Sequence, residues 1–341
     1  MTRSPATGSL LGLALGDALG FPTEFNDVPA ILAKCGPWRE MELPGHPVAY
    51  ITDDTQMALA TARALRTATG RGTLGPKRFE RPLREEFVDW YQSPDNNRAP
   101  GNTCLRACAL LKTESRPWQE ASQIHSKGCG ANMRVTPLGL VPGLGGEQRA
   151  GAAQLQAGLT HGHPTGLAAA DLTAHAVRLL AAGAEPTGLV GLLRSYAYEN
   201  RGTYHERWLG DLWKRGDEPT PERFIAQGWD ECLAVLERLE AALREANPEV
   251  DPCLATGAGW IAEEALATAL LCFLQFVDDP VLALRRAACT SGDSDSIAAL
   301  AGAFAGAHIG ADAWPKEWVS RIEHRDELLD FGAEWDAPVT G

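Results

Sequence analysis

The chain has 341 residues, enough for one large domain or two ordinary ones, and 45% of them are hydrophobic. Its 44 acidic residues outnumber its 31 basic ones, and the formal net charge of -13 disfavours general binding to nucleic acid or to an anionic membrane. No stretch approaches the roughly 20 apolar residues of a membrane-spanning helix, so we expect a soluble protein.

The first predicted element is an apolar segment marked by glycines. They recur at every fourth position from Gly8 to Gly20, and Asp17 interrupts the apolar run, which argues against a secretory signal peptide. A second row with the same spacing runs from Gly302 to Gly310. Because Gly destabilises a helix by roughly 1 kcal/mol relative to Ala, such rows predict helices whose bare faces pack closely against a neighbour, rather than direct ligand contacts.

Most of the remaining pattern is helical. Segments with Ala, Leu, Glu and Arg at helical spacing occupy residues 55–68, 166–183, 229–246 and 260–277. Alternating runs rich in β-branched residues, which are typical of strands, are nearly absent. Clusters of Pro and Gly at 70–82, 92–102 and 140–148 predict breaks between helices, and none is typical of an interdomain linker. We therefore predict an all-α protein with a single domain over residues 1–341.

The cysteines indicate a reducing environment. Eight of them lie at positions 35, 104, 108, 129, 232, 253, 272 and 289, with no CxxC pair. This spacing predicts reduced, mostly buried thiols in a cytoplasmic protein rather than a disulfide framework. Cys104, Cys108 and Cys129 could act as nucleophiles only beside a base, and we favour packing roles for all three.

Two acidic segments precede predicted helices. The first, TDDT, contains Asp53 and Asp54, and the second, SGDSDS, contains Asp293 and Asp295. One interpretation is ordinary helix capping, for which Ser, Thr and Asp are favoured. The other is a metal centre, because a cap needs one acceptor and these segments carry four aspartates with interleaved hydroxyls. Without a cation, four carboxylates brought together would repel one another.

Ligands that are all oxygen, with no Cys or His cluster, favour Mg²⁺ or Mn²⁺ over zinc. Two such ions could hold a bridging water and lower its pKa. Asp17 and Glu24, in the stretch GDALGFPTEF, form a third acidic site. Glu24 follows Pro22 at a predicted helix exit, where its carboxylate either reaches into a cleft or is an exposed loop acid.

Seven stretches, in this order, resemble the ADP-ribosylglycohydrolase family. They are GDALGFPTEF, ITDDTQMALA, GNTCLRA, SKGCGANMRVTPLGL, LTHGHPTGLAAA, GWIAEEALATAL and SGDSDSIAALAGA. The resemblance covers residues 9 to about 310. It implies a compact orthogonal bundle of helices with two Mg²⁺ ions in a cleft.

The resemblance also implies which residues hold the metal. They are Thr52, Asp53, Asp54, Asp293, Asp295 and Ser296. Glu24 matches a family glutamate that gates entry or positions the substrate. Serine stands at 294 and 296 where threonine is commoner in the family, and Ser296 keeps the ligand oxygen.

For the substrate, the loop SKGCGANMR resembles the family's pyrophosphate-binding segment. It assigns to ligand binding Ser126, Gly128, Cys129, Gly130, Ala131, Asn132 and Met133. Two of these, Gly128 and Gly130, permit close approach of the backbone to anionic oxygens. His161 matches a histidine near the ribose and phosphate, whereas His163 is expected to be structural.

Further residues complete the expected cleft. Those that match the family's cleft wall are Gly101, Asn102 and Thr103. Adenine needs an aromatic or apolar platform, and the pattern leaves open a choice among Tyr196, Tyr198, Trp208, Trp213 and Trp260.

The implied reaction is hydrolysis of the bond between C1″ of the terminal ribose of ADP-ribose and an acceptor. Asp54, Asp293 and Asp295 would tune the attacking water, and Glu24 would shape its approach. The alternatives are a metal-dependent pyrophosphohydrolase and a catalytically silent ADP-ribose-binding or structural protein, for which damaged metal motifs are expected. The acceptor stays open between arginine, serine, a nucleic-acid base and a small molecule, and we expect a monomer.

Overall fold

The computed structural model describes residues 3–70, 72–245 and 247–338. Within these ranges the regular elements are helices, and β-pairing is limited to isolated bridges such as that between Ala49 and Ile322. The predicted all-α class is confirmed. Residue 246, at the end of the helix predicted over 229–246, lies outside the described residues.

The helices follow one another through short connections. The α-helices are α1 (Pro5–Gly20), α2 (Val28–Cys35), α3 (Asp53–Thr69), α4 (Pro76–Gln92), α5 (Asn102–Leu111), α6 (Trp118–Ala121), α7 (Thr136–Leu140), α8 (Gly146–Gly158), α9 (Pro164–Ala181), α10 (Leu189–Asn200), α11 (Glu206–Leu209), α12 (Pro221–Glu245), α13 (Cys253–Thr256), α14 (Ala262–Gln275), α15 (Pro280–Ala288), α16 (Ser294–Ile309), α17 (Lys316–Arg321) and α18 (Arg325–Asp336). The 3-10 helices are η1 (Phe21–Thr23), η2 (Trp38–Glu40), η3 (Cys129–Ala131), η4 (Pro186–Gly188), η5 (Leu212–Arg215) and η6 (Ala311–Ala313).

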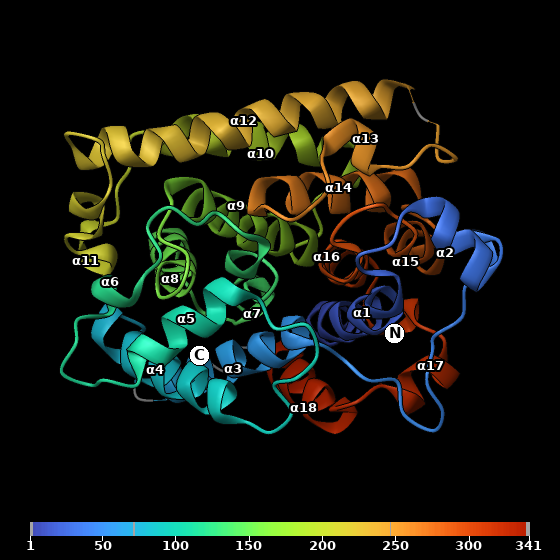
Figure 1. Cartoon of the computed structure of the whole chain (residues 1–341), viewed down its shortest axis with the longest axis horizontal. Coiled ribbons are helices and arrows are strands. Elements are labelled where there is room, and N and C mark those ends of the chain that lie inside the picture. The colour runs from blue at the N-terminus through green and yellow to red at the C-terminus, as the bar shows by residue number, and fades with distance from the viewer. Residues whose placement is uncertain (1–2, 71, 246, 339–341) are drawn as a thin grey trace.

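The helices are arranged around α9, which packs against α7, α8, α12, α14 and α16. The long helix α12 runs along one side of the molecule, and α3, α4 and α18 lie on the opposite side (Figure 1). Between these sides, α1 and α16 lie against each other and run across the direction of α12 (Figure 1). This arrangement is the orthogonal bundle that the family resemblance implied.

One predicted break between helices is wrong in part. The cluster at 70–82 does end α3, but α4 begins inside it at Pro76 and continues through Pro82. Pro76 stands in the first turn, where its missing N–H has no partner to lose. Pro82 lies in the helix interior, which costs roughly 3 kcal/mol, and the burial of Phe79 and Phe87 on the same helix offsets that cost.

The two glycine rows form one close interface between α1 and α16. A Cβ built on Gly12 would lie 2.2 Å from the carbonyl oxygen of Gly302, and a Cβ built on Gly302 would lie 2.0 Å from the carbonyl oxygen of Gly12. A Cβ on Gly16 would lie 2.0 Å from the carbonyl oxygen of Ala298. The backbones therefore touch where any larger residue would force them apart, and the predicted close packing is confirmed.

This interface fixes the positions of two acidic segments. The helices run antiparallel, because Gly8 meets the end of α16 and Gly20 meets its start at Asp295. The end of α1, which leads through η1 to Glu24, is thereby held beside the start of α16. The hydroxyl groups of Thr23 and Ser294 lie 3.0 Å apart and reinforce this junction.

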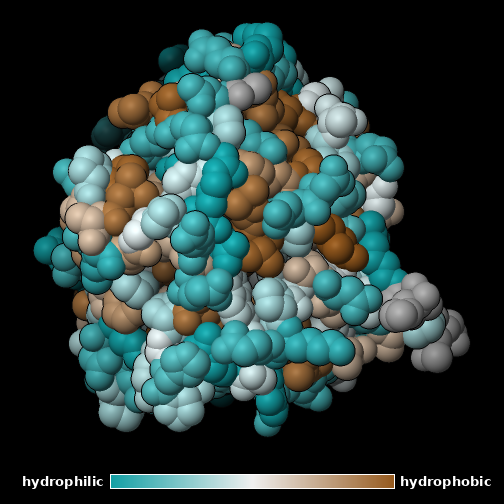
Figure 2. All heavy atoms as spheres, turned by 90° about the vertical axis from the view of Figure 1, so that its right-hand side faces the viewer, coloured by the Kyte–Doolittle hydropathy of each residue, from teal (hydrophilic) through white to brown (hydrophobic). Residues whose placement is uncertain are grey.

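Figure 2 shows the end of the molecule at which α2 and α17 lie in Figure 1. Hydrophilic side chains cover much of this face, and hydrophobic atoms are exposed between them (Figure 2). In the part of the chain that the structure describes, no helix combines the length and the apolar character that crossing a membrane requires.

Candidate active site

A cavity of about 310 Å³ opens where the end of α1 meets the starts of α3, α5 and α16. Acidic side chains line it together with a glycine-rich loop and aromatic residues. The lining residues are Glu24, Phe25, Asp53, Asp54, Ala99, Pro100, Gly101, Asn102, Thr103, Cys104, Gly128, Cys129, Gly130, Met133, His161, Trp260, Asp293, Asp295 and Ser296. The two acidic segments that are far apart in the sequence therefore share one cavity.

Four of the predicted site residues do not line this cavity. Thr52 is buried, and its Oγ1 accepts a hydrogen bond of 3.3 Å from the backbone N–H of Asp54. The Oγ of Ser126 lies 3.0 Å from the Oγ1 of Thr103, and the Nδ2 of Asn132 donates to the carbonyl oxygen of Ala262. Ala131 is fully buried in η3. Three of these four residues thus form hydrogen bonds that hold cavity-lining segments in place.

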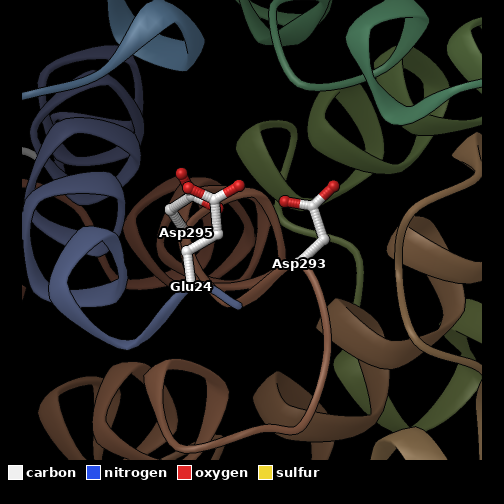
Figure 3. Close-up of side chains that lie close together, drawn as sticks. All are labelled: Glu24, Asp293 and Asp295. Atoms are coloured by element: carbon white, nitrogen blue, oxygen red, sulfur yellow. The ribbon is translucent and has the colours of Figure 1, made fainter. Parts of the chain in front are cut away.

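Three carboxylates converge from two elements (Figure 3). One carboxylate oxygen each from Glu24, Asp293 and Asp295 lies within 4.8 Å of the others. Two unit charges at this separation repel by about 3 kcal/mol at an effective dielectric constant of roughly 20. The cluster is therefore unfavourable as a set of bare anions, and protons or a cation must compensate it.

Helix capping explains the role of Thr52 but not that of Asp293. Thr52 caps α3 through its side chain, whereas Asp293 at the start of α16 makes no capping hydrogen bond with its side chain. Asp53 accepts a hydrogen bond of 3.3 Å from the backbone N–H of Gly101. The carboxylate of Asp54 has an oxygen without a hydrogen-bond partner among the described residues, and it is therefore available for another partner.

Asp17 does not line the cavity, but it holds the start of α3 in position. It is fully buried on α1, and its carboxylate accepts hydrogen bonds from the backbone N–H groups of Thr52 and Thr55. The hydroxyl of Thr55 donates to it as well, at 2.5 Å. The sequence singled out Asp17 as acidic but gave it no role. The structure shows that it fixes the position of Asp53 and Asp54 relative to α1.

Burial raises the pKa of every carboxyl group in this centre, and repulsion by Asp295 raises the pKa of its neighbours further. Burial, followed by the charge of Asp295, raises the pKa of Glu24 to about 9, that of Asp53 to about 8 and that of Asp17 to about 7. The same two causes hold the pKa of Asp54 and of Asp293 well above the ordinary range. A cation placed among these groups would reverse both effects, since it favours their charged forms.

The residues present fit a hard divalent cation. In the described part of the chain, Oε2 of Glu24 and Oδ2 of Asp54 are buried without a hydrogen-bond partner. The carboxylates and the hydroxyl of Ser296 offer oxygen ligands, and burial keeps the thiol of Cys129 beside them protonated, so the site suits Mg²⁺ or Mn²⁺ better than zinc. Unpartnered buried oxygens are costly unless something else binds them.

The glycine-rich loop forms the opposite part of the lining. The backbone N–H of Cys129 donates to the carbonyl oxygen of Trp260, and that of Ala262 donates to the carbonyl oxygen of Lys127. These bonds tie the loop to the start of α14. Gly128, Gly130 and Met133 then line the cavity, with His161 beside them.

The structure selects one of the five aromatic residues that the sequence left open. Trp260 lines the cavity, whereas Tyr196, Tyr198, Trp208 and Trp213 do not. Trp260 is stacked on Phe25, with ring centroids 5.3 Å apart. The sequence pattern did not point to Phe25, a residue that is 72% exposed and lines the cavity. The sequence feature that could have identified Phe25 is that it directly follows Glu24.

The cysteines of the cavity are poor nucleophiles. Cys104 and Cys129 line it, and burial raises the pKa of Cys104 to about 11 and that of Cys129 well above its ordinary range. Both therefore stay in the unreactive thiol form at neutral pH. All eight cysteines lie within the described residues, and none forms a disulfide. This agrees with the packing roles predicted from the sequence.

Comparisons with known proteins agree with this architecture. The model of the family described as ADP-ribosylglycohydrolase matches residues 2–338. The chain is 28% identical over 329 residues to the "ADP-ribosyl-[dinitrogen reductase] glycohydrolase" of Rhodospirillum rubrum, an alignment that covers 94% of this chain and 91% of that protein. It is 28% identical over 349 residues to "ADP-ribosylhydrolase ARH3" of Homo sapiens, covering 94% of this chain and 89% of that protein.

A solved structure shows the same fold. It is described as "ADP-ribosylglycohydrolase-related protein complex" and superposes with a TM-score of 0.67 at 24% sequence identity, covering 98% of this chain and 97% of that one. The family match spans nearly all of the sequence, and the predicted resemblance is confirmed. The chain therefore belongs to the ADP-ribosylglycohydrolase family.

Proposed function

We propose that this hydrolase of glycosyl bonds is a Mg²⁺-dependent ADP-ribosylhydrolase that cleaves between C1″ of the terminal ribose and an acceptor. The observation that carries the proposal is the shared cavity, in which five carboxylates face a glycine-rich loop. The names of the relatives from Rhodospirillum rubrum and Homo sapiens refer to the same class of reaction. The chain acts as one domain, and the substrate is an ADP-ribosyl compound.

The acidic side of the cavity is suited to the reacting ribose. The residues that would hold two Mg²⁺ ions are Asp53, Asp54, Asp293, Asp295 and Ser296, which line the cavity. Glu24 lies beside Asp293 and Asp295, and Thr52 directly precedes Asp53 without lining the cavity. Bound there, the ions would neutralise the carboxylates and lower the pKa of a water molecule. Because Asp17 and the glycine interface fix both segments, the carboxylates are preorganised for this task.

The reaction breaks the C1″–acceptor bond and adds the elements of water. The hydroxyl goes to C1″ and the proton goes to the acceptor, so that ADP-ribose is released. The carboxylates of Asp54, Asp293 and Asp295 accept hydrogen bonds from the attacking water, and their negative charge stabilises the oxocarbenium-like transition state. Glu24 and Phe25 border the cavity beside Asp295 and limit the approach of the acceptor.

The opposite side of the cavity is suited to the ADP portion. Gly128 and Gly130 line the cavity, and their backbone is the part of this loop that would approach the oxygens of a pyrophosphate. Trp260 offers a flat apolar surface next to the loop. We propose that these residues bind the diphosphate and the base.

Product analysis tests the proposal. The purified protein is incubated with ADP-ribose linked to arginine, to serine and to a DNA base, with Mg²⁺ and with EDTA. We expect free ADP-ribose and an unmodified acceptor from at least one substrate, and only with Mg²⁺. Release of AMP instead would show pyrophosphate cleavage, and an undiminished rate in EDTA would contradict the metal requirement.

The acidic centre also predicts an unusual dependence of stability on pH. Carboxyl groups of the unfolded chain titrate near pH 4, whereas burial and like charge raise the pKa of Asp17 to about 7 and that of Asp53 to about 8. Between these limits the folded state binds more protons than the unfolded state. The free energy of unfolding without Mg²⁺ therefore falls as pH rises, by up to about 1.4 kcal/mol per pH unit for each extra bound proton.

Urea unfolding at about pH 6.5 and about pH 8.5 measures this effect, in EDTA and in Mg²⁺. Stability in EDTA should decline over this range, and Mg²⁺ should flatten the decline because the cation replaces the protons. Equal slopes in EDTA and Mg²⁺ would show that the carboxyl groups do not bind the ion.

A further inference from the structure

Arg134 lies behind the cavity as a buried cation without an ion-pair partner among the described residues. It is fully buried and forms no ion pair with a carboxylate among the described residues, although the charge of Asp53 acts on it from a greater distance. Its Nε donates to Oε1 of Gln156 at 2.9 Å, and its Nη2 donates to the carbonyl oxygen of Gln156 at 2.9 Å and to Oγ1 of Thr160 at 2.6 Å. Its guanidinium also lies over the ring of Phe87, 4.5 Å from the centroid. Neutral groups thus accept the hydrogen bonds of Arg134. Its positive charge is therefore left to act on neighbouring side chains such as His161.

Thr160 connects this cation to the histidine of the cavity. Its Oγ1 lies 2.8 Å from Nδ1 of His161 and 3.4 Å from the carbonyl oxygen of Ala157. A guanidinium can only donate, so Oγ1 accepts from Arg134 and has one proton of its own to give. The shorter contact is with Nδ1. The hydroxyl therefore donates to Nδ1, which must be the unprotonated nitrogen of the ring.

The opposite tautomer is disfavoured on two grounds. If Nδ1 carried the proton, Oγ1 would accept from both His161 and Arg134, and its own proton would be left with the 3.4 Å contact to Ala157. An N–H dipole would also point toward the positive charge of Arg134. Burial, followed by that charge, holds the pKa of His161 well below its usual range, so the ring is neutral and has a single N–H.

The remaining nitrogen, Nε2, faces the glycine-rich loop and the cavity. A Cβ built on Gly128 would lie 3.2 Å from Nε2, and one built on Gly130 would lie 2.7 Å from Cε1 of the ring. Glycine at these two positions therefore leaves room for the ring at the cavity wall. His161 lines the cavity, and its only side-chain hydrogen bond to another described residue is the one from Nδ1.

We propose that Arg134 and Thr160 are positioning residues that hold His161 in its Nε2–H form, aimed as a hydrogen-bond donor at a pyrophosphate oxygen of the substrate. A histidine that is neutral and locked in one tautomer is a donor and not a general base. The identity of the oxygen rests on the function proposed above. The tautomer does not, since it follows from contacts within the chain.

Long-range ¹H–¹⁵N correlation spectroscopy of the free protein, labelled with ¹⁵N-histidine, reads the tautomer directly. The His161 signals are identified by their loss in His161→Gln. We expect a protonated Nε2 and an unprotonated Nδ1 in the wild type, and the same pattern in Thr160→Ser, which keeps the hydroxyl. In Thr160→Val the Nδ1 signal should move toward the protonated position. A protonated Nδ1 in the wild-type spectrum would overturn the proposal, whether or not any variant folds.

Calorimetry with ADP-ribose and with ADP tests the consequence. Thr160→Val should weaken the binding of both ligands by about 5-fold and Thr160→Ser by less than about 2-fold. His161→Asn, which removes the donor from the Nε2 position, should weaken both by roughly 10-fold or more, whereas His161→Gln should retain much of the affinity. Unchanged affinity in Thr160→Val would overturn the positioning role. A loss for ADP-ribose but not for ADP would overturn the assignment to the pyrophosphate.

Thr173→Val is a matched control. Thr173, on α9, is fully buried as Thr160 is, and its hydroxyl has no hydrogen-bond partner among the described residues. The same substitution there should leave the His161 signals and both affinities unchanged. Because the spectrum is recorded without substrate, it separates a failure of this inference from a failure of the proposed reaction.

Discussion

Replacing Asp295 by Asn should lower kcat/KM by roughly 10³-fold, equivalent to about 4 kcal/mol of transition-state stabilisation. Asp295 lies within 4.8 Å of Glu24 and Asp293, and its charge raises the pKa of Glu24, Asp53 and Asp54 alike. Asp295 is therefore the residue whose charge acts on all of these carboxyl groups. An amide in its place would remove one ligand charge and weaken the binding of Mg²⁺. Steady-state kinetics over a range of Mg²⁺ concentrations measures both effects.

The same substitution should stabilise the protein in EDTA, because it removes a buried negative charge from a repulsive cluster. Loss of activity with a raised unfolding midpoint would separate a functional defect from a folding defect. Asp326→Asn is the matched control, since its side chain is 86% exposed and lies outside the cavity. It should change neither quantity. Wild-type turnover in Asp295→Asn would refute the role of the acidic centre.

The second large effect concerns the contact between α1 and α16. Replacing Gly302 by Val should lower the free energy of unfolding by about 3 kcal/mol, because the new Cβ would lie 2.0 Å from the carbonyl oxygen of Gly12. A backbone cannot yield as the end of a side chain can, so the helices must separate. Activity should fall with stability, since this interface positions Glu24 and Asp295. Urea unfolding and kcat measured together test this expectation.

Gly191 offers a control in the same kind of structure. It is an exposed glycine within α10, and a Cβ built there would meet nothing within 4 Å. Gly191→Ala should stabilise the protein by about 0.5–1 kcal/mol, as expected for a glycine in a helix without a packing role. If Gly302→Val were as stable as the wild type, the helices would not be held by backbone contact.

Much of the fold could be predicted because its helices satisfy local rules. The periodic segments that begin at Thr55 and Gly166 form the bodies of α3 and α9, and the glycine rows meet as their spacing predicted. The error at α4 came from reading Pro82 as a helix breaker. Local rules cannot show that the burial of Phe79 and Phe87 outweighs the lost backbone hydrogen bond.

The candidate site was predictable in its residue types and less so in its arrangement. The family motifs pointed to the carboxylates and to the loop at Gly128, and the structure places both in one cavity. The roles of Asp17 and Thr160 could not be predicted, since each depends on contacts with residues distant in sequence or on a buried charge. Phe25 was missed because an exposed aromatic residue in a loop has no periodic signature.

We propose above that the segments around Asp54 and Asp293 hold divalent cations that the reaction requires. A crystal of the protein soaked with Mn²⁺, with diffraction measured near the manganese absorption edge, tests it most directly. We predict anomalous peaks between the carboxylates of Asp53, Asp54, Asp293 and Asp295, and their loss in Asp295→Asn. Anomalous density elsewhere in the molecule, with none in this cavity, would contradict a metal site at these carboxylates.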